Sequence, residues 1–80
     1  MKNQGYRIID LIPVSITKDG QESGFVIGHN PAAPSPWVTW RYTKKKGVPS
    51  SISYYSGNYW VEERNARCDF YRRISDSYAD

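Results

Sequence analysis

The side chains of this chain that could carry out covalent chemistry are few. Cys68 and His29 form the only possible cysteine–histidine pair, and a thiol nucleophile needs such a base close to it. We predict Cys68 on a helix and His29 at a strand end, which makes this pair a weak candidate. Glu62 and Glu63 are adjacent, so on a helix they point about 100° apart and form no acid–base pair. We therefore expect a protein that is not an enzyme, with a Cys68-dependent enzyme as the third alternative.

The single cysteine and the single histidine also limit metal and cofactor chemistry. One cysteine cannot form an intramolecular disulfide, and the two residues together are too few for a structural zinc site. We expect no metal and no cofactor. A chain without disulfides is typical of a reducing compartment, and its apolar stretches are too short to cross a membrane. We therefore expect a cytoplasmic protein without a membrane partner, and the sequence gives no indication of its oligomeric state.

Basic and aromatic residues form the more informative group. Residues 41–73 hold eight basic residues against three acidic ones, and the chain as a whole has a formal net charge of +3. Basic side chains neutralise phosphates and aromatic rings stack on bases or sugars, so this combination favours nucleic acid as a partner. The alternative is that the lysines only solubilise a turn and that the rings belong to the core. The predicted binding residues are Trp37, Arg41, Lys44, Lys45, Lys46 and Tyr55.

Hydrophobic patterns predict the elements that would position these residues. Runs that are rich in isoleucine and valine, or that alternate with polar residues, predict strands at about 6–12, 14–17, 25–29, 37–42 and 51–55. Pro13 is expected to be a break or an edge position between the first two runs. In residues 37–42 side chains alternate between the two faces of the predicted strand. The face toward the core should carry Val38, Trp40 and Tyr42, and the other face should carry Trp37, Thr39 and Arg41.

A helix over about 61–74 is the clearest prediction. Glu62 and Glu63 lie in its first turn and Arg72 and Arg73 in its last, as the helix dipole favours. Its apolar line is narrow and should pack on one face of a sheet: Ala66, Phe70 and Ile74. The expected fold is therefore α+β, a small antiparallel sheet of four or five strands packed by one C-terminal helix, in a single domain over residues 1–80.

Two connections carry their own predictions. Prolines at positions 31, 34 and 36 predict a stiff, extended segment that crosses the edge of the sheet. Gly57-Asn58 predicts either a two-residue hairpin turn or a bulge that leads the chain into the helix.

Several of these residues stand in an order that resembles a known DNA-binding fold. They are Pro36-Trp37-x-x-Trp40, then Tyr55-Ser56-Gly57, then Tyr59, and Ala66 with Phe70 on the helix. Over residues 36–71 this order resembles the three-stranded DNA-binding domain of ethylene-response factors and of the arm-binding region of phage integrases. In that family the sheet lies in the major groove, and the resemblance implies DNA contacts by Trp37 and Tyr55. The family's arginine-rich strand before the Pro-Trp motif is replaced here by residues 30–36.

A second resemblance concerns the segments GFVIGHNPAAPSPWVTW and DFYRR. They are similar to small uncharacterised proteins carried on conjugative elements and phages of Gram-positive bacteria. The resemblance implies accessory cargo of a mobile element, which commonly binds nucleic-acid machinery or blocks host defence. We therefore expect a non-enzymatic binding module that acts on nucleic acid or on a nucleic-acid-handling complex. The alternative is a protein inhibitor of a host defence nuclease, of the anti-CRISPR type.

Overall fold

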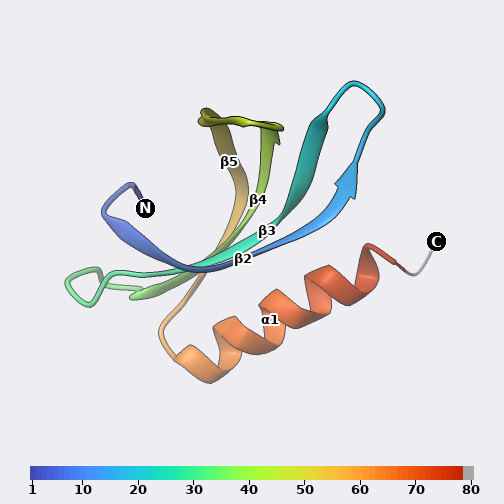
Figure 1. Cartoon of the computed structure of the whole chain (residues 1–80). Coiled ribbons are helices and arrows are strands. Elements are labelled where there is room, and N and C mark those ends of the chain that lie inside the picture. The colour runs from blue at the N-terminus through green and yellow to red at the C-terminus, as the bar shows by residue number, and fades with distance from the viewer. Residues whose placement is uncertain (79–80) are drawn as a thin grey trace.

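The computed structural model describes residues 1–78 as a five-stranded antiparallel sheet with one helix against it (Figure 1). The elements are β1 (Lys2–Asn3), β2 (Tyr6–Ile16), β3 (Gln21–His29), β4 (Trp37–Lys45), β5 (Val48–Trp60) and α1 (Glu63–Asp76). The strands lie in the order of the chain, so each neighbouring pair is a hairpin. The predicted α+β class, with a C-terminal helix packed on an antiparallel sheet, is confirmed.

Pro13 does not divide the first long strand. The two runs that we predicted on either side of it form the single strand β2, which pairs with β3 over most of its length. Beyond Ile8, β2 is an edge of the sheet because β1 pairs only with Tyr6 and Arg7. Proline has no backbone N–H, but at a sheet edge this removes no hydrogen bond between strands. The pairing of β2 with β3 shifts between Pro13 and Ser15, which accommodates the proline. The predicted break was therefore wrong, and the edge position is confirmed.

Gly57-Asn58 lies inside a strand and closes no hairpin. β5 continues to Trp60, well past the predicted end at 55, and its pairing with β4 shifts between Thr39 and Arg41. Ser56 has a positive φ of 55°, so the chain forms a β-bulge here. The third strand that the first resemblance implies near residue 59 is thus the end of β5, and residues 37–71 hold two strands and a helix.

The proline-containing loop folds back on itself between β3 and β4. The N–H of Asn30 donates to the carbonyl of Pro36 at 2.8 Å, and the N–H of Ala33 donates to the carbonyl of Asn30 at 3.1 Å. The side-chain Oδ1 of Asn30 accepts a further bond from the N–H of Ala32 at 3.0 Å. The prediction of an extended segment crossing the sheet edge was wrong, because Asn30 supplies the local acceptors that turn the chain.

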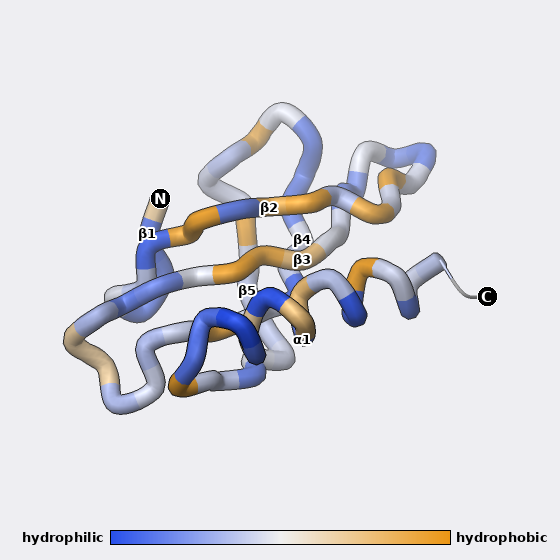
Figure 2. The backbone as a smooth tube through the Cα atoms, turned by 90° about the horizontal axis from the view of Figure 1, so that it is seen from below, coloured by the Kyte–Doolittle hydropathy of each residue, from blue (hydrophilic) through white to orange (hydrophobic). Residues whose placement is uncertain are grey.

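One face of the sheet packs against α1. Phe25 and Ile27 of β3 are buried against Ala66 and Phe70 of the helix, and Ile74 packs at the border of this cluster. The predicted apolar line of the helix is confirmed by these contacts, although α1 begins and ends two residues later than predicted. Hydrophilic residues make up much of α1, whereas β2 and β3 carry hydrophobic stretches beside it (Figure 2). Among residues 1–78 there is no helix with the length and apolarity needed to cross a membrane.

The opposite face is buried by the curvature of the sheet itself. Ring centroids of Tyr6 on β2 and Tyr59 on β5 lie 6.0 Å apart. In a flat sheet three interstrand spacings, about 14 Å, would separate these two strands. The sheet therefore rolls toward the face away from α1 (Figure 1). This second core contains the residues of β4 that alternation predicted to be buried, namely Val38, Trp40 and Tyr42, which are at most 3% exposed. It also contains Val26 of β3.

Candidate nucleic-acid interface

The six predicted binding residues do not form one cluster. Trp37 begins β4 and Lys45 ends it, and eight residues of extended chain correspond to about 26 Å. Trp37 is half-buried at the helix side of the sheet, where its ring stacks on that of His29 with centroids 4.1 Å apart. Trp37 therefore belongs to the packing at one end of the sheet, and the lysines lie at the other end.

The lysine run is divided between the two faces of the sheet. Lys44 lies on the rolled face, where its Nζ is 3.8 Å from Oε2 of Glu22. The same oxygen accepts a 2.6 Å hydrogen bond from Tyr42, whose pKa is strongly raised by burial and then by Glu22. Lys45 is exposed on the helix side opposite Gln21, and Lys46 is exposed in the turn. Within residues 1–78 neither Lys45 nor Lys46 forms an ion pair.

Arg41 and Tyr55 are brought together by the register of β4 and β5. They are direct cross-strand partners, and the guanidinium carbon of Arg41 lies 5.9 Å from the centre of the Tyr55 ring. The same carbon lies 5.4 Å from the ring of Phe25 on β3. Within residues 1–78 the guanidinium makes no hydrogen bond and no ion pair. Two rings thus hold this charge in place while its donors stay available to a ligand.

Arg73 of α1, which the sequence places in the last turn of the helix, adds a second cation next to Phe25. Its guanidinium carbon lies 5.3 Å from the ring of Phe25. It donates to the carbonyl and the Oγ1 of Thr39 at 3.2 and 3.0 Å, and to the carbonyl of Ser56 at 2.8 Å. These bonds fix Arg73 across β4 and β5. The residue could not be identified from the sequence, because its position depends on how α1 crosses the sheet.

The electrostatic surroundings of Arg73 contain an excess of positive charge. Burial lowers the pKa of Arg73, and Asp69 opposes this shift. Repulsion from Arg41 and Arg72 lowers the pKa further. An anion placed beside Arg41 and Arg73 would offset this repulsion.

A row of hydroxyl residues crosses the sheet next to Arg41. The register pairs Ser15 with Ser23, Ser23 with Thr43, and Thr43 with Ser53 across β2 to β5. All four side chains are exposed or half-buried. We name the surface formed by this row and its basic and aromatic neighbours the polar platform; it consists of Ser15, Ser23, Arg41, Thr43, Lys45, Ser53 and Tyr55.

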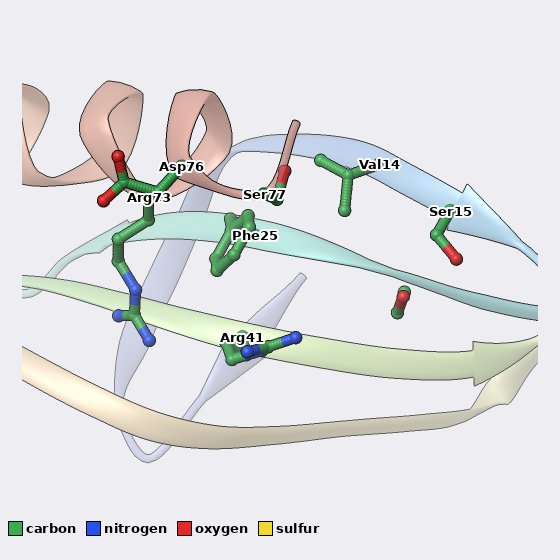
Figure 3. Close-up of a pocket in the computed structure, with 8 residues that line it drawn as sticks. Val14, Ser15, Phe25, Arg41, Arg73, Asp76 and Ser77 are labelled. Carbon is green, nitrogen blue, oxygen red and sulfur yellow. The ribbon is translucent and has the colours of Figure 1, made fainter. Parts of the chain in front are cut away.

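A cavity of about 500 Å³ adjoins the polar platform below the last turn of α1 (Figure 3). In Figure 3 Arg73 reaches from the helix toward the sheet, Arg41 lies along β4, and Phe25 lies between them. The Asp76 carboxylate is on the helix side of the cavity, away from Arg41. The complete lining is Val14, Ser15, Ser23, Phe25, Arg41, Arg73, Asp76 and Ser77. Two cationic side chains against one anionic one make the cavity suitable for an anion.

Asp69 connects α1 to the sheet and thereby positions Arg73. It is buried, and burial alone would raise its pKa, but the hydrogen bonds that it accepts outweigh burial and lower the pKa. Four side chains donate to its carboxylate: Thr39 Oγ1 at 2.5 Å, Asn58 Nδ2 at 3.1 Å, Trp60 Nε1 at 3.3 Å and Arg72 Nη2 at 2.6 Å.

Cys68 and His29 have different surroundings in the structure. Cys68 is exposed on α1 and lines a cavity of about 210 Å³ with Trp60 and Arg72, among others. His29 stacks on Trp37, and among the described residues no hydrogen bond joins its ring to the thiol. Residues 1–78 also contain no group of three or more histidine, cysteine or acidic residues that could hold a metal ion.

Comparison of the chain with models of protein families, with curated proteins and with solved structures gives no match. The two resemblances described above therefore stay predictions. The geometry adds one fact that concerns the first of them: Tyr55 and Trp37 lie on the face of the sheet that carries α1, and the face away from α1 is rolled into a core.

Proposed function

We propose that this protein is a non-enzymatic module that binds nucleic acid through the polar platform. The observation that carries the proposal is the guanidinium of Arg41, which is held between Phe25 and Tyr55 with no partner among residues 1–78. Arginine, lysine and hydroxyl side chains supply most phosphate contacts in complexes with nucleic acids. An exposed ring such as Tyr55, 42% accessible, can stack on an unpaired base. These groups together favour a single strand over a duplex.

The first experiment measures binding of a labelled single strand and of a duplex of mixed sequence at two salt concentrations. Each phosphate contact contributes a log–log slope of about −0.7 for a single strand. Contacts by Arg41 and Lys45 of the polar platform and by Arg73 of the adjoining cavity then predict a slope of about −2, or roughly a 20-fold loss of affinity between about 50 and 200 mM salt. Failure to bind either nucleic acid at the lower salt would reject the proposal.

Two adjacent lysines provide a matched pair of variants. Lys45→Ala removes a charge from the polar platform and should weaken single-strand binding and reduce the salt slope by about 0.7. Lys44→Ala removes the same charge from the opposite face, where Glu22 already neutralises it, and should change neither quantity. Equal losses in the two variants would show that only net charge matters and that the platform is not the interface.

A protein partner is the second candidate function, and one observation favours it. The outward side of α1 carries a cavity of about 530 Å³ lined by Glu63, Arg64, Arg67, Cys68 and Tyr71. Tyr71 is 56% exposed, and tyrosine and arginine are enriched at the energetic centres of protein interfaces. Inhibition of a host defence nuclease would use this surface, so Tyr71→Ala should abolish inhibition and leave nucleic-acid binding unchanged.

A further inference from the structure

The polar platform is open at one end and closed at the other. At the open end β4 and β5 continue to the turn at Lys46 and Gly47, which is exposed. At the closed end α1 lies over β4, because Thr39 is fully buried and its Oγ1 donates to Asp69 of the helix at 2.5 Å. A nucleic-acid strand that follows β4 from Lys45 toward Arg41 therefore meets α1 and cannot continue past it on this face.

The cavity lies at this closed end, and its chemistry suits a group of high negative charge. Arg73 is fixed by three hydrogen bonds to β4 and β5. Arg41 is held by the rings of Phe25 and Tyr55, and its hydrogen-bond donors stay available to a ligand. Hydroxyl groups of Ser15, Ser23 and Ser77 line the same space. A terminal phosphate monoester carries up to two charges and three acceptor oxygens, and an internal diester carries only one charge.

We propose that the cavity binds a phosphate monoester at the end of a nucleic-acid strand, so that the module recognises phosphorylated strand ends. Arg41 and Arg73 supply the positive charges, and the hydroxyls of Ser15 and Ser23 supply further donors. The hydroxyl of Ser77 already donates to the carbonyl of Ile74 at 2.5 Å. The inference rests on the proposed function, because the polar platform would hold the nucleotides that follow the terminal one.

Oligonucleotides of one sequence test the inference separately from the proposed function. The set carries a 5′-phosphate, a 3′-phosphate or hydroxyl groups at both ends, and a nucleoside monophosphate is measured beside it. We expect one phosphorylated end to raise affinity about tenfold over the hydroxyl form, as charge-assisted bonds to two arginines would. Equal binding of all three oligonucleotides would overturn the inference and leave the proposed function standing. Binding of none would reject the proposed function itself, and a free monophosphate that binds as tightly as the best oligonucleotide would overturn recognition of strand ends.

Two serines on either side of Thr43 provide matched variants. Ser23 lines the cavity, whereas Ser53 lies on β5 outside it, and both are direct partners of Thr43. Ser23→Asp places a carboxylate beside the cations of the cavity. The ratio of the affinities for the phosphorylated and the hydroxyl oligonucleotide should then fall from about ten to about one. Ser53→Asp should weaken both forms equally and keep the preference. A preference that survives Ser23→Asp would contradict the inference.

Inorganic phosphate provides a readout that needs no variant. In the wild-type protein, added phosphate should shift the NMR signals of Ser23, Ser77 and the Arg41 side chain, at concentrations where chloride shifts none of them. Signals that respond equally to the two anions, or phosphate shifts confined to the turn at Lys46, would overturn the assignment of the cavity.

Discussion

Asp69 shows how one residue joins the helix, the sheet and the candidate site. The residue is 2% exposed, and its carboxylate accepts hydrogen bonds from side chains of β4, β5 and α1. Sequence patterns identified the apolar line of α1 but not this acid, because a charged residue on a helix is usually exposed. Asp69 can be buried because hydrogen-bond donors from β4 and β5 surround its carboxylate. Only the folded sheet and helix bring these donors together.

Asp69→Asn should destabilise the fold by about 2–4 kcal/mol. The amide keeps the volume but loses the charge and one of the two acceptor oxygens. Arg72 at Oδ1 and the donors at Oδ2, among them the buried Thr39, can then no longer all keep a partner. Urea unfolding measures the change. Asp10→Asn is the control, since Asp10 is exposed and should change stability by less than about 0.5 kcal/mol. Similar losses in the two variants would contradict a structural role for Asp69.

The contribution of Asp69 should also depend on pH. Its pKa in the folded protein is lowered below the ordinary value of 3.8, so its ionised form stabilises the fold above that value. As the pH falls through the folded-state pKa, the carboxyl group is protonated and this stabilisation is lost. The difference in unfolding free energy between wild type and Asp69→Asn should therefore be largest near neutral pH and shrink in acid. A constant difference would show that the charge plays no part.

At the scale of the element, the bulge in β5 decides which side chains face α1. Tyr55 is opposite Arg41 and Asn58 is opposite Thr39, so three steps along β5 match two along β4. Without the extra residue, strand alternation would send Tyr55 and Asn58 to opposite faces. The bulge thus allows Tyr55 to join the polar platform while Asn58 donates to Asp69.

Gly57→Ala should destabilise the protein by about 1–3 kcal/mol, because it overpacks the rolled face. A Cβ at this position would lie 2.7 Å from Nε1 of Trp40, whose ring is 3% exposed and closely packed. Thermal unfolding measures the effect. Ser56→Gly is the matched variant: it relieves the positive φ of 55° and should be neutral or stabilise by up to about 1 kcal/mol. Destabilisation of the same size by both variants would argue against this account of the bulge.

At the scale of the whole molecule, the sheet has a different partner on each face. α1 covers one face, and contact between rings of β2, β4 and β5 closes the other. Tyr6 is central to the closure: its ring lies 5.6 Å from that of Trp40, and its hydroxyl donates to the carbonyl of Ser35 at 2.7 Å. One residue thus joins β2 to β4, to β5 and to the proline-containing loop.

Tyr6→Ala should reduce stability by about 3–5 kcal/mol, the range found when a buried aromatic residue is truncated. Tyr71→Ala is the control, because the Tyr71 ring is 56% exposed on the outer side of α1 and should cost about 0.5 kcal/mol or less. Chemical denaturation compares the two variants. If Tyr6→Ala were tolerated as well as Tyr71→Ala, the contact across the rolled face would not be needed for closure.

The sequence by itself determined the class of fold, the placement of the helix after the strands, and the faces of β4 and α1, but it did not predict β1 and divided β2 into two strands. These are local properties: alternation along Trp37–Tyr42 and the helical spacing of Ala66 and Phe70 depend on neighbouring residues only. The same local patterns identified Arg41 and Tyr55 as candidates. They could not separate Lys44 from Lys45, although the two lie on opposite faces, because the predicted strand ended at Tyr42.

Only the tertiary structure decided which residues meet. The hydroxyl row needs the register of four strands at once, and the cavity needs the path of α1 across them to place Arg73 beside Arg41. The roll of the sheet brings Tyr6 to Tyr59 across three interstrand spacings. Each of these contacts joins residues far apart in the chain, and its geometry follows from packing the two faces together, which no local pattern contains.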